Sequence, residues 1–244
     1  MPKVVIIQRV VPSYRLKVYE RLWKDLGWVV AYGRNIGTEG MKLEQGERFL
    51  KGYDFTETRL GFIKVPVARI ISELKPDAII AEGALRMSST WELIARRKLL
   101  GRPRFYFWGI GYNASKGGNP EQSKTQWIYP AVYRQADGCL AYGRDGKQFL
   151  ESHLGGKPVF LAQNSIDMDA IRQARDSAPP LPKRGFPELV SVSRITPMKE
   201  YVKLVDAFHL VLKSFPNAQL TIIGDGPELD RIRQAAGEEL DRHI

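Results

Sequence analysis

The amino-acid sequence predicts an α/β protein with parallel sheets, and three features support this prediction. Short apolar runs of strand length alternate with segments in which apolar residues recur at the helical period. Loops that contain glycine or proline separate these segments. The composition, with 43% hydrophobic and 26% charged residues in a chain of 244, is ordinary for a protein that buries a core. Such alternation is typical of a parallel sheet covered by helices.

Seven strands are predicted in the first part of the chain. They are residues 4–7, 28–32, 56–60, 78–81, 105–108, 138–142 and 159–162. Residues 34–55 are charged and rich in glycine, have no clear period, and are predicted to form a long loop. Seven strands that alternate with helices predict one doubly wound domain.

The helices between these strands are predicted from the 3.6-residue period and from turn residues. Ser13 is predicted to cap the first helix, whose buried face would include Tyr19 and Trp23. The other predicted helices are residues 67–74, residues 89–100, residues 124–135 with a kink at Pro130, a helix that ends near Gly155, and residues 168–175.

A proline-rich segment separates a second domain from the first. Residues 177–187 hold four prolines, so the predicted domains are residues 1–175 and 188–244, with a linker at 176–187. In the second domain we predict strands at residues 189–193 and 219–223, a helix at 201–215, and another helix that begins at Pro227. Two strands cannot cover the faces and edges of a parallel sheet, so we expect this domain to be incomplete.

Basic residues and glycines follow the two strands of the second domain. Arg194 and Lys199 come after the first strand, and Gly224, Asp225 and Gly226 come after the second. Open parallel sheets bind ligands at the carboxyl ends of their strands, so these residues predict an anionic ligand, most simply a diphosphate. The alternative is that Arg194 and Lys199 are solvated and that the glycines only form a turn.

The order of residues in these loops resembles the nucleotide-sugar-binding half of the family 4 retaining glycosyltransferases of the GT-B fold. The matching residues are Ser193, Arg194, Ile195 and Lys199 before a helix, and Gly224, Asp225, Gly226 and Pro227 after the next strand. Ser193 and Glu200 stand where the family has glycine. The resemblance implies two Rossmann-like domains and transfer of a sugar from a nucleotide-diphospho-sugar to an acceptor hydroxyl, with retention of configuration. It also implies that Arg194 and Lys199 contact the donor diphosphate and that no cofactor is needed.

Polar residues at strand ends of the first domain are candidates for acceptor contacts. Tyr14 and Arg15 follow the first strand and Glu82 follows the fourth, although surface or capping roles fit them equally well.

Two further segments resemble acceptor-side parts of the same family. Gly109, Tyr112 and Asn113 lie in a segment that resembles a Trp-Gly-His-Gly stretch beside the acceptor, with Ile110 in the position of the histidine. Asn164 lies in a segment similar to the family's Asn-Gly-Val-Asp, which implies a place in the cleft between the domains.

Two other motifs favour ordinary structural roles. Gly109, Gly111 and Ala114 are spaced as in a dinucleotide fingerprint, which leaves an oxidoreductase as an alternative, but no acidic residue follows at about 20 positions. Asp167 and Asp169 are spaced as in a metal-binding Asp-x-Asp motif, yet they precede a predicted helix. We therefore predict that Asp167 caps this helix and that no metal site is present.

The basic charge is concentrated in the first part of the chain. Residues 188–244 carry seven Lys or Arg and nine Asp or Glu, a net charge of −2, so the total of +10 leaves +12 for residues 1–187. Basic surfaces attract nucleic acids, anionic membranes or phosphorylated substrates. The sequence has no zinc-finger, helix-turn-helix or single-strand-binding pattern, so no nucleic-acid partner is predicted. An anionic membrane surface, or a glycan or lipid-linked acceptor that carries phosphate, is favoured.

The single cysteine, Cys139, and the lack of an apolar run of ~20 residues predict a cytoplasmic protein. The basic charge of the first part favours a peripheral location at the inner face of the membrane. In the family that the chain resembles, a later segment with two glutamates separated by seven residues holds the donor sugar, and this sequence ends at Ile244 before such a segment. We expect either a truncated enzyme that is inactive alone or a degenerate relative that binds nucleotide and acceptor without catalysis. No catalytic residue is predicted.

Overall fold

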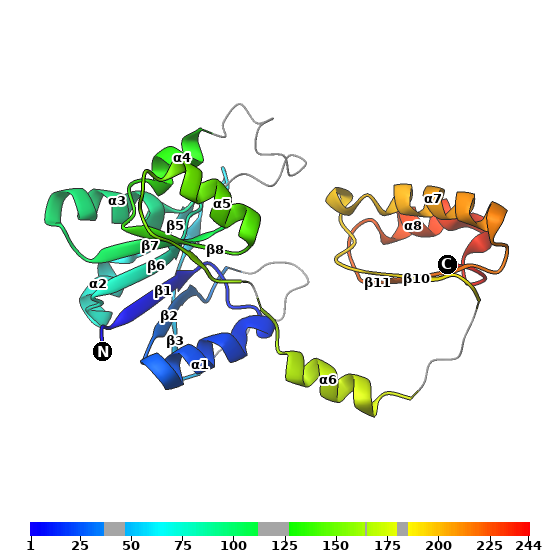
Figure 1. Cartoon of the computed structure of the whole chain (residues 1–244), viewed down its shortest axis with the longest axis horizontal. Helices are drawn as coiled ribbons and strands as arrows, with labels where there is room; N and C mark the ends of the chain where they lie inside the picture. The colour runs from blue at the N-terminus through cyan, green and yellow to red at the C-terminus, as the bar shows by residue number, and fades with distance from the viewer. Residues whose placement is uncertain (37–46, 112–126, 164, 180–184) are drawn as a thin grey trace. The chain divides into compact units, whose positions relative to one another are not determined.

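The structure, a computed structural model, describes residues 1–36, 47–111, 127–163, 165–179 and 185–244. It divides the chain into two compact units, Met1–Arg172 and Gln173–Ile244, and the boundary falls within helix α6 (Met168–Ser177) (Figure 1). We call them unit 1 and unit 2. The predicted linker at 176–187 includes residues 180–184, which lie outside the described residues.

Unit 1 is built on a seven-stranded sheet in which every pair of neighbouring strands is parallel. In spatial order the strands are β3 (Leu50–Tyr53), β2 (Val29–Gly33), β1 (Val4–Gln8), β6 (Ala78–Glu82), β7 (Arg104–Gly109), β8 (Gly138–Ala141) and β9 (Val159–Leu161). The strand order reverses between β1 and β6, where doubly wound sheets bind ligands. The predicted α/β class with a parallel sheet is confirmed.

Helices cover both faces of this sheet (Figure 1). One face packs against α2 (Val67–Leu74), α3 (Ser88–Leu100), α4 (Ile128–Tyr133) and α5 (Arg144–His153). The other face packs against α1 (Leu16–Leu26), which follows the short 3-10 helix η1 (Ser13–Arg15). Successive strand residues alternate between the two cores, so Val5 and Ile7 lie in the first and Val4 and Ile6 in the second.

The prediction for the third strand was wrong in position. β3 lies inside the predicted loop, whereas Thr56 and Glu57 form β4 (Thr56–Glu57), which pairs antiparallel with β5 (Ile63–Lys64) in a separate hairpin. Leu50 and Tyr53 are buried, but Lys51 and Gly52 between them have low strand propensity. The strand forms because its backbone pairs with β2, a contact that the sequence pattern does not record.

Three predicted local features also differ from the structure. Ser13 makes no capping hydrogen bond, because the chain enters α1 through η1 instead. Pro130 occupies the first turn of α4, where its missing N–H costs nothing, so it produces no kink. Pro227 precedes the N-cap Glu228 of α8 (Leu229–Ala236) and is therefore not the first helical residue.

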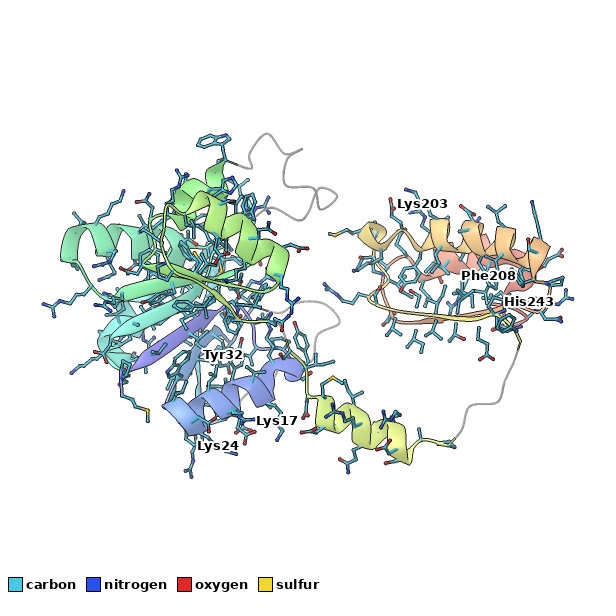
Figure 2. All side chains as sticks on the ribbon, in the orientation of Figure 1. Lys17, Lys24, Tyr32, Lys203, Phe208 and His243 are labelled. Carbon is cyan, nitrogen blue, oxygen red and sulfur yellow. The ribbon has the colours of Figure 1, made fainter. Side chains whose placement is uncertain are left out.

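The sheet of unit 2 consists of two parallel strands, β10 (Glu188–Val192) and β11 (Gln219–Ile223). The intervening chain forms the 3-10 helix η3 (Pro197–Lys199) and α7 (Tyr201–Ser214), and the chain ends with α8 and η4 (Gly237–Glu239). Figure 2 shows Phe208 on the side of α7 that faces the strands, where it is buried, and Lys203 on the opposite side of the helix. No helix among the described residues is both long and apolar enough to cross a bilayer.

Candidate functional site

Backbone hydrogen bonds join the loop after β10 to the loop after β11 in unit 2. The Ser193 amide donates to the Ile223 carbonyl oxygen at 3.2 Å, and the Ile195 amide donates to the Asp225 carbonyl oxygen at 2.8 Å. The Glu228 amide closes the set by donating to the Ile195 carbonyl oxygen at 3.4 Å. The two predicted ligand-binding loops therefore form one surface at the carboxyl ends of the strands (Figure 1).

The two glycines are required by this close approach. A Cβ atom on Gly224 would collide with the carbonyl oxygen of Ser193, and one on Gly226 would collide with the carbonyl oxygen of Ile195. Gly226 also has a φ of +154°, a conformation that favours glycine. The glycines thus allow one loop to pack against the other. The sequence had predicted only that they form a turn or let the backbone approach a ligand.

The five predicted donor-site residues lie together on this surface. Arg194 and Lys199 are exposed, on either side of Ile195, which is buried and anchors the loop. The Asp225 carboxylate accepts a hydrogen bond from the Gly226 amide at 2.7 Å, which shapes the second loop. Both α7 and α8 begin here, so their N-terminal N–H groups add to the positive potential.

Sequence reasoning missed a cluster of three hydroxyl groups beside these loops. The Tyr201 hydroxyl lies 3.1 Å from Ser191 Oγ and 2.9 Å from Ser193 Oγ. Hydrogen bonds from Ser191 and then Ser193 lower the pKa of Tyr201. The signal in the sequence was the alternation of the two serines, which puts both side chains on one face of the strand end.

A second candidate site lies in unit 1, at the carboxyl ends of β1 and β6. The Arg9 amide, just after β1, donates a 2.8 Å hydrogen bond to Glu82 Oε1 at the end of β6. Burial raises the pKa of Glu82, and the hydrogen bond from Arg9 opposes this shift without cancelling it. The carboxylate is therefore a stronger base than an ordinary glutamate and already holds one backbone donor.

The guanidinium of Arg15 is enclosed by aromatic rings. Its Cζ lies 5.1 Å from the ring centroid of Tyr142, 5.7 Å from that of Trp108 and 5.8 Å from that of Tyr14, so cation–π attraction fixes the group. Arg15 also donates to Gln8 Oε1 and to the Tyr142 hydroxyl, each at 3.4 Å. Burial lowers the pKa of Arg15, but Tyr142 and Tyr19 outweigh it, so the net shift is upward.

Gly109 allows the end of β7 to lie close to a buried aromatic ring. A Cβ atom at this position would be 2.9 Å from the Tyr133 hydroxyl, which is tighter than side chains tolerate. The Gly109 carbonyl oxygen accepts a hydrogen bond from the Tyr142 amide at 3.2 Å. Gly109 therefore helps to place Tyr142 against Arg15.

A pocket of about 600 Å³ opens beside Glu82, within the range of small-molecule sites. Its walls combine two carboxylates, two guanidinium groups and an aromatic side chain, and these residues are Glu57, Glu82, Arg9, Arg86 and Tyr129. Carboxylates accept hydrogen bonds from hydroxyl groups, and guanidinium groups bind phosphate or carboxylate. The pocket thus suits a polar ligand that has hydroxyl and anionic groups.

Tyr14, Arg15, Glu82 and Gly109 all lie at this edge of the unit 1 sheet, as predicted from their positions after strands. The predicted acceptor residues Tyr112, Asn113 and Asn164 lie outside the described residues.

Sequence reasoning missed other polar residues at the same edge. They are Gln8, Arg9, Glu57, Arg86 and Tyr142. Gln8 gave a usable signal, because a polar residue at the end of an apolar strand is unusual; it is only 2% exposed, and its Nε2 has no partner among the described residues.

Asp167 has the predicted capping role. Its Oδ1 accepts hydrogen bonds from the amides of Asp169 and Ala170, both at 3.2 Å, in the first turn of α6. Asp169 forms an exposed ion pair with Arg172. Within the described part of the chain, no group of three or more His, Cys, Asp or Glu side chains is arranged to hold a metal ion.

Solved structures share this architecture over the whole chain. A UDP-forming α,α-trehalose-phosphate synthase from Burkholderia xenovorans is 15% identical with a TM-score of 0.59, and the match covers 100% of this chain and 71% of that one. MnaA of S. aureus, solved with UDP, is 13% identical with a TM-score of 0.55 and covers 100% of this chain and 67% of that one. The chain has the α/β fold of the GT-B glycosyltransferases. At these identities the likeness establishes the GT-B fold alone.

Sequence comparisons match the chain to glycosyltransferases. The model of the family described as "Glycosyl transferases group 1" matches residues 173–243, which are almost the whole of unit 2. An uncharacterized glycosyltransferase of Methanocaldococcus jannaschii is 24% identical over 187 residues. This match covers 69% of the chain, and the chain spans 44% of the relative's length.

Proposed function

We propose that the chain belongs to a glycosyltransferase that moves a glycosyl group from a nucleotide-diphospho-sugar to a hydroxyl of a glycan or lipid-linked acceptor. One observation carries the proposal. Backbone hydrogen bonds join the loop that contains Arg194 and Lys199 to the loop that contains Gly224 and Gly226, at the carboxyl ends of β10 and β11. The group 1 family match covers these same loops, and the GT-B fold supports the assignment.

In this proposal unit 2 binds the diphosphate of the donor. As the bond between the anomeric carbon and the diphosphate breaks, negative charge develops on the leaving oxygen. Arg194 and Lys199 stabilise that charge, and the N-termini of α7 and α8 contribute N–H donors. The acceptor oxygen forms the new bond to the anomeric carbon, and its proton leaves with the nucleoside diphosphate. The resemblance of the loop residues to the family 4 enzymes supports retention of configuration.

The acceptor binds at the pocket of unit 1. Glu82 accepts a hydrogen bond from an acceptor hydroxyl, since this carboxylate lines the pocket and its basicity is raised. Arg15 and Tyr14 contact the acceptor nearby, and Gly109 keeps Tyr142 in place behind Arg15. The positive net charge of residues 1–187 favours an acceptor that carries phosphate. It also favours a cytoplasmic location at an anionic membrane surface.

Calorimetry with nucleoside diphosphates tests the donor site. In the full chain, Arg194→Ala should weaken binding of the preferred one among UDP, GDP and ADP by about 1.5–3 kcal/mol, the range for a lost charge-assisted hydrogen bond. Lys213→Ala is the matched control, because Lys213 is an exposed cation in the last turn of α7, at the opposite end from Lys199. Equal affinities for Arg194→Ala and the unaltered chain would exclude this role.

A further inference from the structure

An exposed apolar and basic surface lies at the end of α3, on the side of unit 1 opposite to the pocket. Leu99 is 82% exposed and Leu100 is 62% exposed. The nearby cations Lys98, Arg102 and Arg104 are exposed as well. These five residues are called the α3–β7 patch below.

Hydrogen bonds fix the patch to the amino edge of the sheet. Gly101, with a φ of +68°, ends α3 and turns the chain toward β7. The Arg104 amide donates to the Asp77 carbonyl oxygen at 3.3 Å, and the Asp77 amide donates to the Lys3 carbonyl oxygen at 2.8 Å. Lys3 therefore lies at the same edge, and Figure 1 shows the N-terminus and the turn after α3 on the same side of unit 1.

The charge of this surface is largely uncompensated. Residues 96–104 contain five Arg or Lys and no Asp or Glu. Arg96 pairs with Glu92 at 2.9 Å and Arg97 with Asp137 at 2.6 Å, so these two are neutralised. The remaining three cations, Lys98, Arg102 and Arg104, form no ion pair with any residue that the structure describes.

We propose that the α3–β7 patch docks the protein on an anionic lipid bilayer, with Leu99 and Leu100 inserted at the headgroup boundary and the three cations on lipid phosphates. Exposed leucines ringed by cations are the pattern of interfacial membrane contacts. Two leucines are far too small for a stable protein interface, which buries roughly 800 Å² per partner. The inference rests on the anionic-surface binding included in the proposed function and gives that binding a location.

The location has a consequence for the acceptor. The patch lies at the amino ends of the strands and the pocket at their carboxyl ends. Five-residue strands rise about 3.3 Å per residue, so the two surfaces are separated by roughly 17 Å. The pocket then opens away from the bilayer and reaches an acceptor that extends beyond the lipid headgroups.

Vesicle flotation of the full chain tests the patch. Vesicles of phosphatidylcholine with phosphatidylserine should bind the protein, binding should fall with added salt, and phosphatidylcholine alone should bind poorly. Two double variants should each reduce partitioning onto these vesicles by about tenfold or more: Leu99→Ser with Leu100→Ser, and Lys98→Gln with Arg102→Gln. The binding free energy lost is about 1 kcal/mol per cation and more per leucine. Circular dichroism should show that both variants remain folded.

A control pair removes the same charge elsewhere. Lys17 and Lys24 lie on the outer side of α1 (Figure 2), so Lys17→Gln with Lys24→Gln lowers the net charge equally without touching the patch. This pair should bind vesicles nearly as well as the unaltered chain. Loss of binding equal to that of the patch variants would show that diffuse charge acts and would overturn the proposal.

A probe at the patch reports insertion directly. Cys139 is buried, so Leu99→Cys offers a single accessible thiol for an environment-sensitive fluorophore. Its emission should shift to the blue with phosphatidylserine vesicles, and a label on Lys24→Cys should not respond. The absence of a blue shift would overturn membrane docking. A change in oligomeric state caused by Leu99→Ser with Leu100→Ser in the absence of vesicles would also overturn it. Absence of any vesicle binding would also remove the membrane part of the proposed function, whereas nucleotide calorimetry tests sugar transfer separately.

Discussion

The amide of Ile195 donates a 2.8 Å hydrogen bond to the carbonyl oxygen of Asp225, which ties the loops after β10 and β11 in unit 2 together through their backbones. Side chains do not make this link, so it tolerates changes at most positions in both loops. An added atom that separates the backbones breaks it, and Gly224 and Gly226 are positions where a Cβ would do so.

Gly224→Ala should destabilise unit 2 by about 1–3 kcal/mol, the usual cost of forcing an extra carbon into a packed site. The new Cβ pushes the loop away from Ser193, so nucleotide affinity should fall as well. All five tryptophans precede residue 128, so tryptophan fluorescence reports unit 1 alone. Urea unfolding followed by far-ultraviolet circular dichroism should show an earlier transition for unit 2 while the fluorescence transition stays in place.

Gly143→Ala serves as the control for this prediction. Its Cβ would meet no atom within 4 Å, and Gly143 lies in unit 1, so this substitution should leave the transition of unit 2 in place. A shift of the unit 2 transition equal to that of Gly224→Ala would show that the contact with Ser193 is not the cause.

Glu200→Gly should stabilise unit 2. Glu200 has φ +51° and ψ +40°, a left-handed conformation that glycine adopts without strain. Relief of that strain should gain about 1 kcal/mol, since the exposed ion pair with Lys203 that is lost contributes little. Chemical unfolding monitored by circular dichroism measures the change, and Glu200→Ala should give no gain. The same geometry explains physically why glycine suits this position in the family that the loop resembles.

The fold was largely predictable because strands of a buried parallel sheet are apolar runs. The predicted ranges 78–81 and 105–108 lie within β6 and β7, whose side chains pack against cores on both faces. β3 was missed because it is an edge strand, held by backbone pairing to β2 and by two buried side chains. Local periodicity does not encode such a tertiary contact.

The candidate sites were predictable only in part. Residues directly after strands, such as Arg194 and Glu82, are brought to one edge by the parallel topology alone. The stacking of Trp108 and Tyr142 on Arg15 depends on how β7 and β8 align with η1 across more than 90 residues of sequence. Side-chain direction at that range is set by packing, so the sequence gives no local sign of it.

Arg15→Ala should destabilise unit 1 by about 1–2 kcal/mol, because it removes a partly desolvated cation that contacts three aromatic rings. Urea unfolding followed by tryptophan fluorescence measures this loss. Arg21→Ala is the control, since Arg21 is 84% exposed on α1 and its ion pair with Asp25 is also exposed, which predicts almost no change. Equal effects of the two substitutions would mean that the rings do not stabilise Arg15.

Glu82→Gln should stabilise unit 1 at neutral pH, and the gain should shrink as the pH falls. Burial raises the pKa of Glu82 above the value of about 4.3 in the unfolded chain, so the folded state disfavours the carboxylate. The neutral amide avoids this penalty and its oxygen can still accept the hydrogen bond from the Arg9 amide. The difference between variant and unaltered chain should be largest above the folded-state pKa and constant below about pH 4.

Glu73→Gln provides a comparison of opposite sign, because the hydrogen bonds from Arg69 and Tyr53 lower the pKa of Glu73. The folded state favours this carboxylate, so Glu73→Gln should destabilise unit 1 at neutral pH, and its deficit should disappear as the pH falls through the folded-state pKa. Tryptophan-monitored urea unfolding from about pH 8 to about pH 3.5 measures both variants, since the range spans the unfolded-state pKa of glutamate. A pH-independent difference for Glu82→Gln would contradict burial of its charge at the edge of the unit 1 pocket.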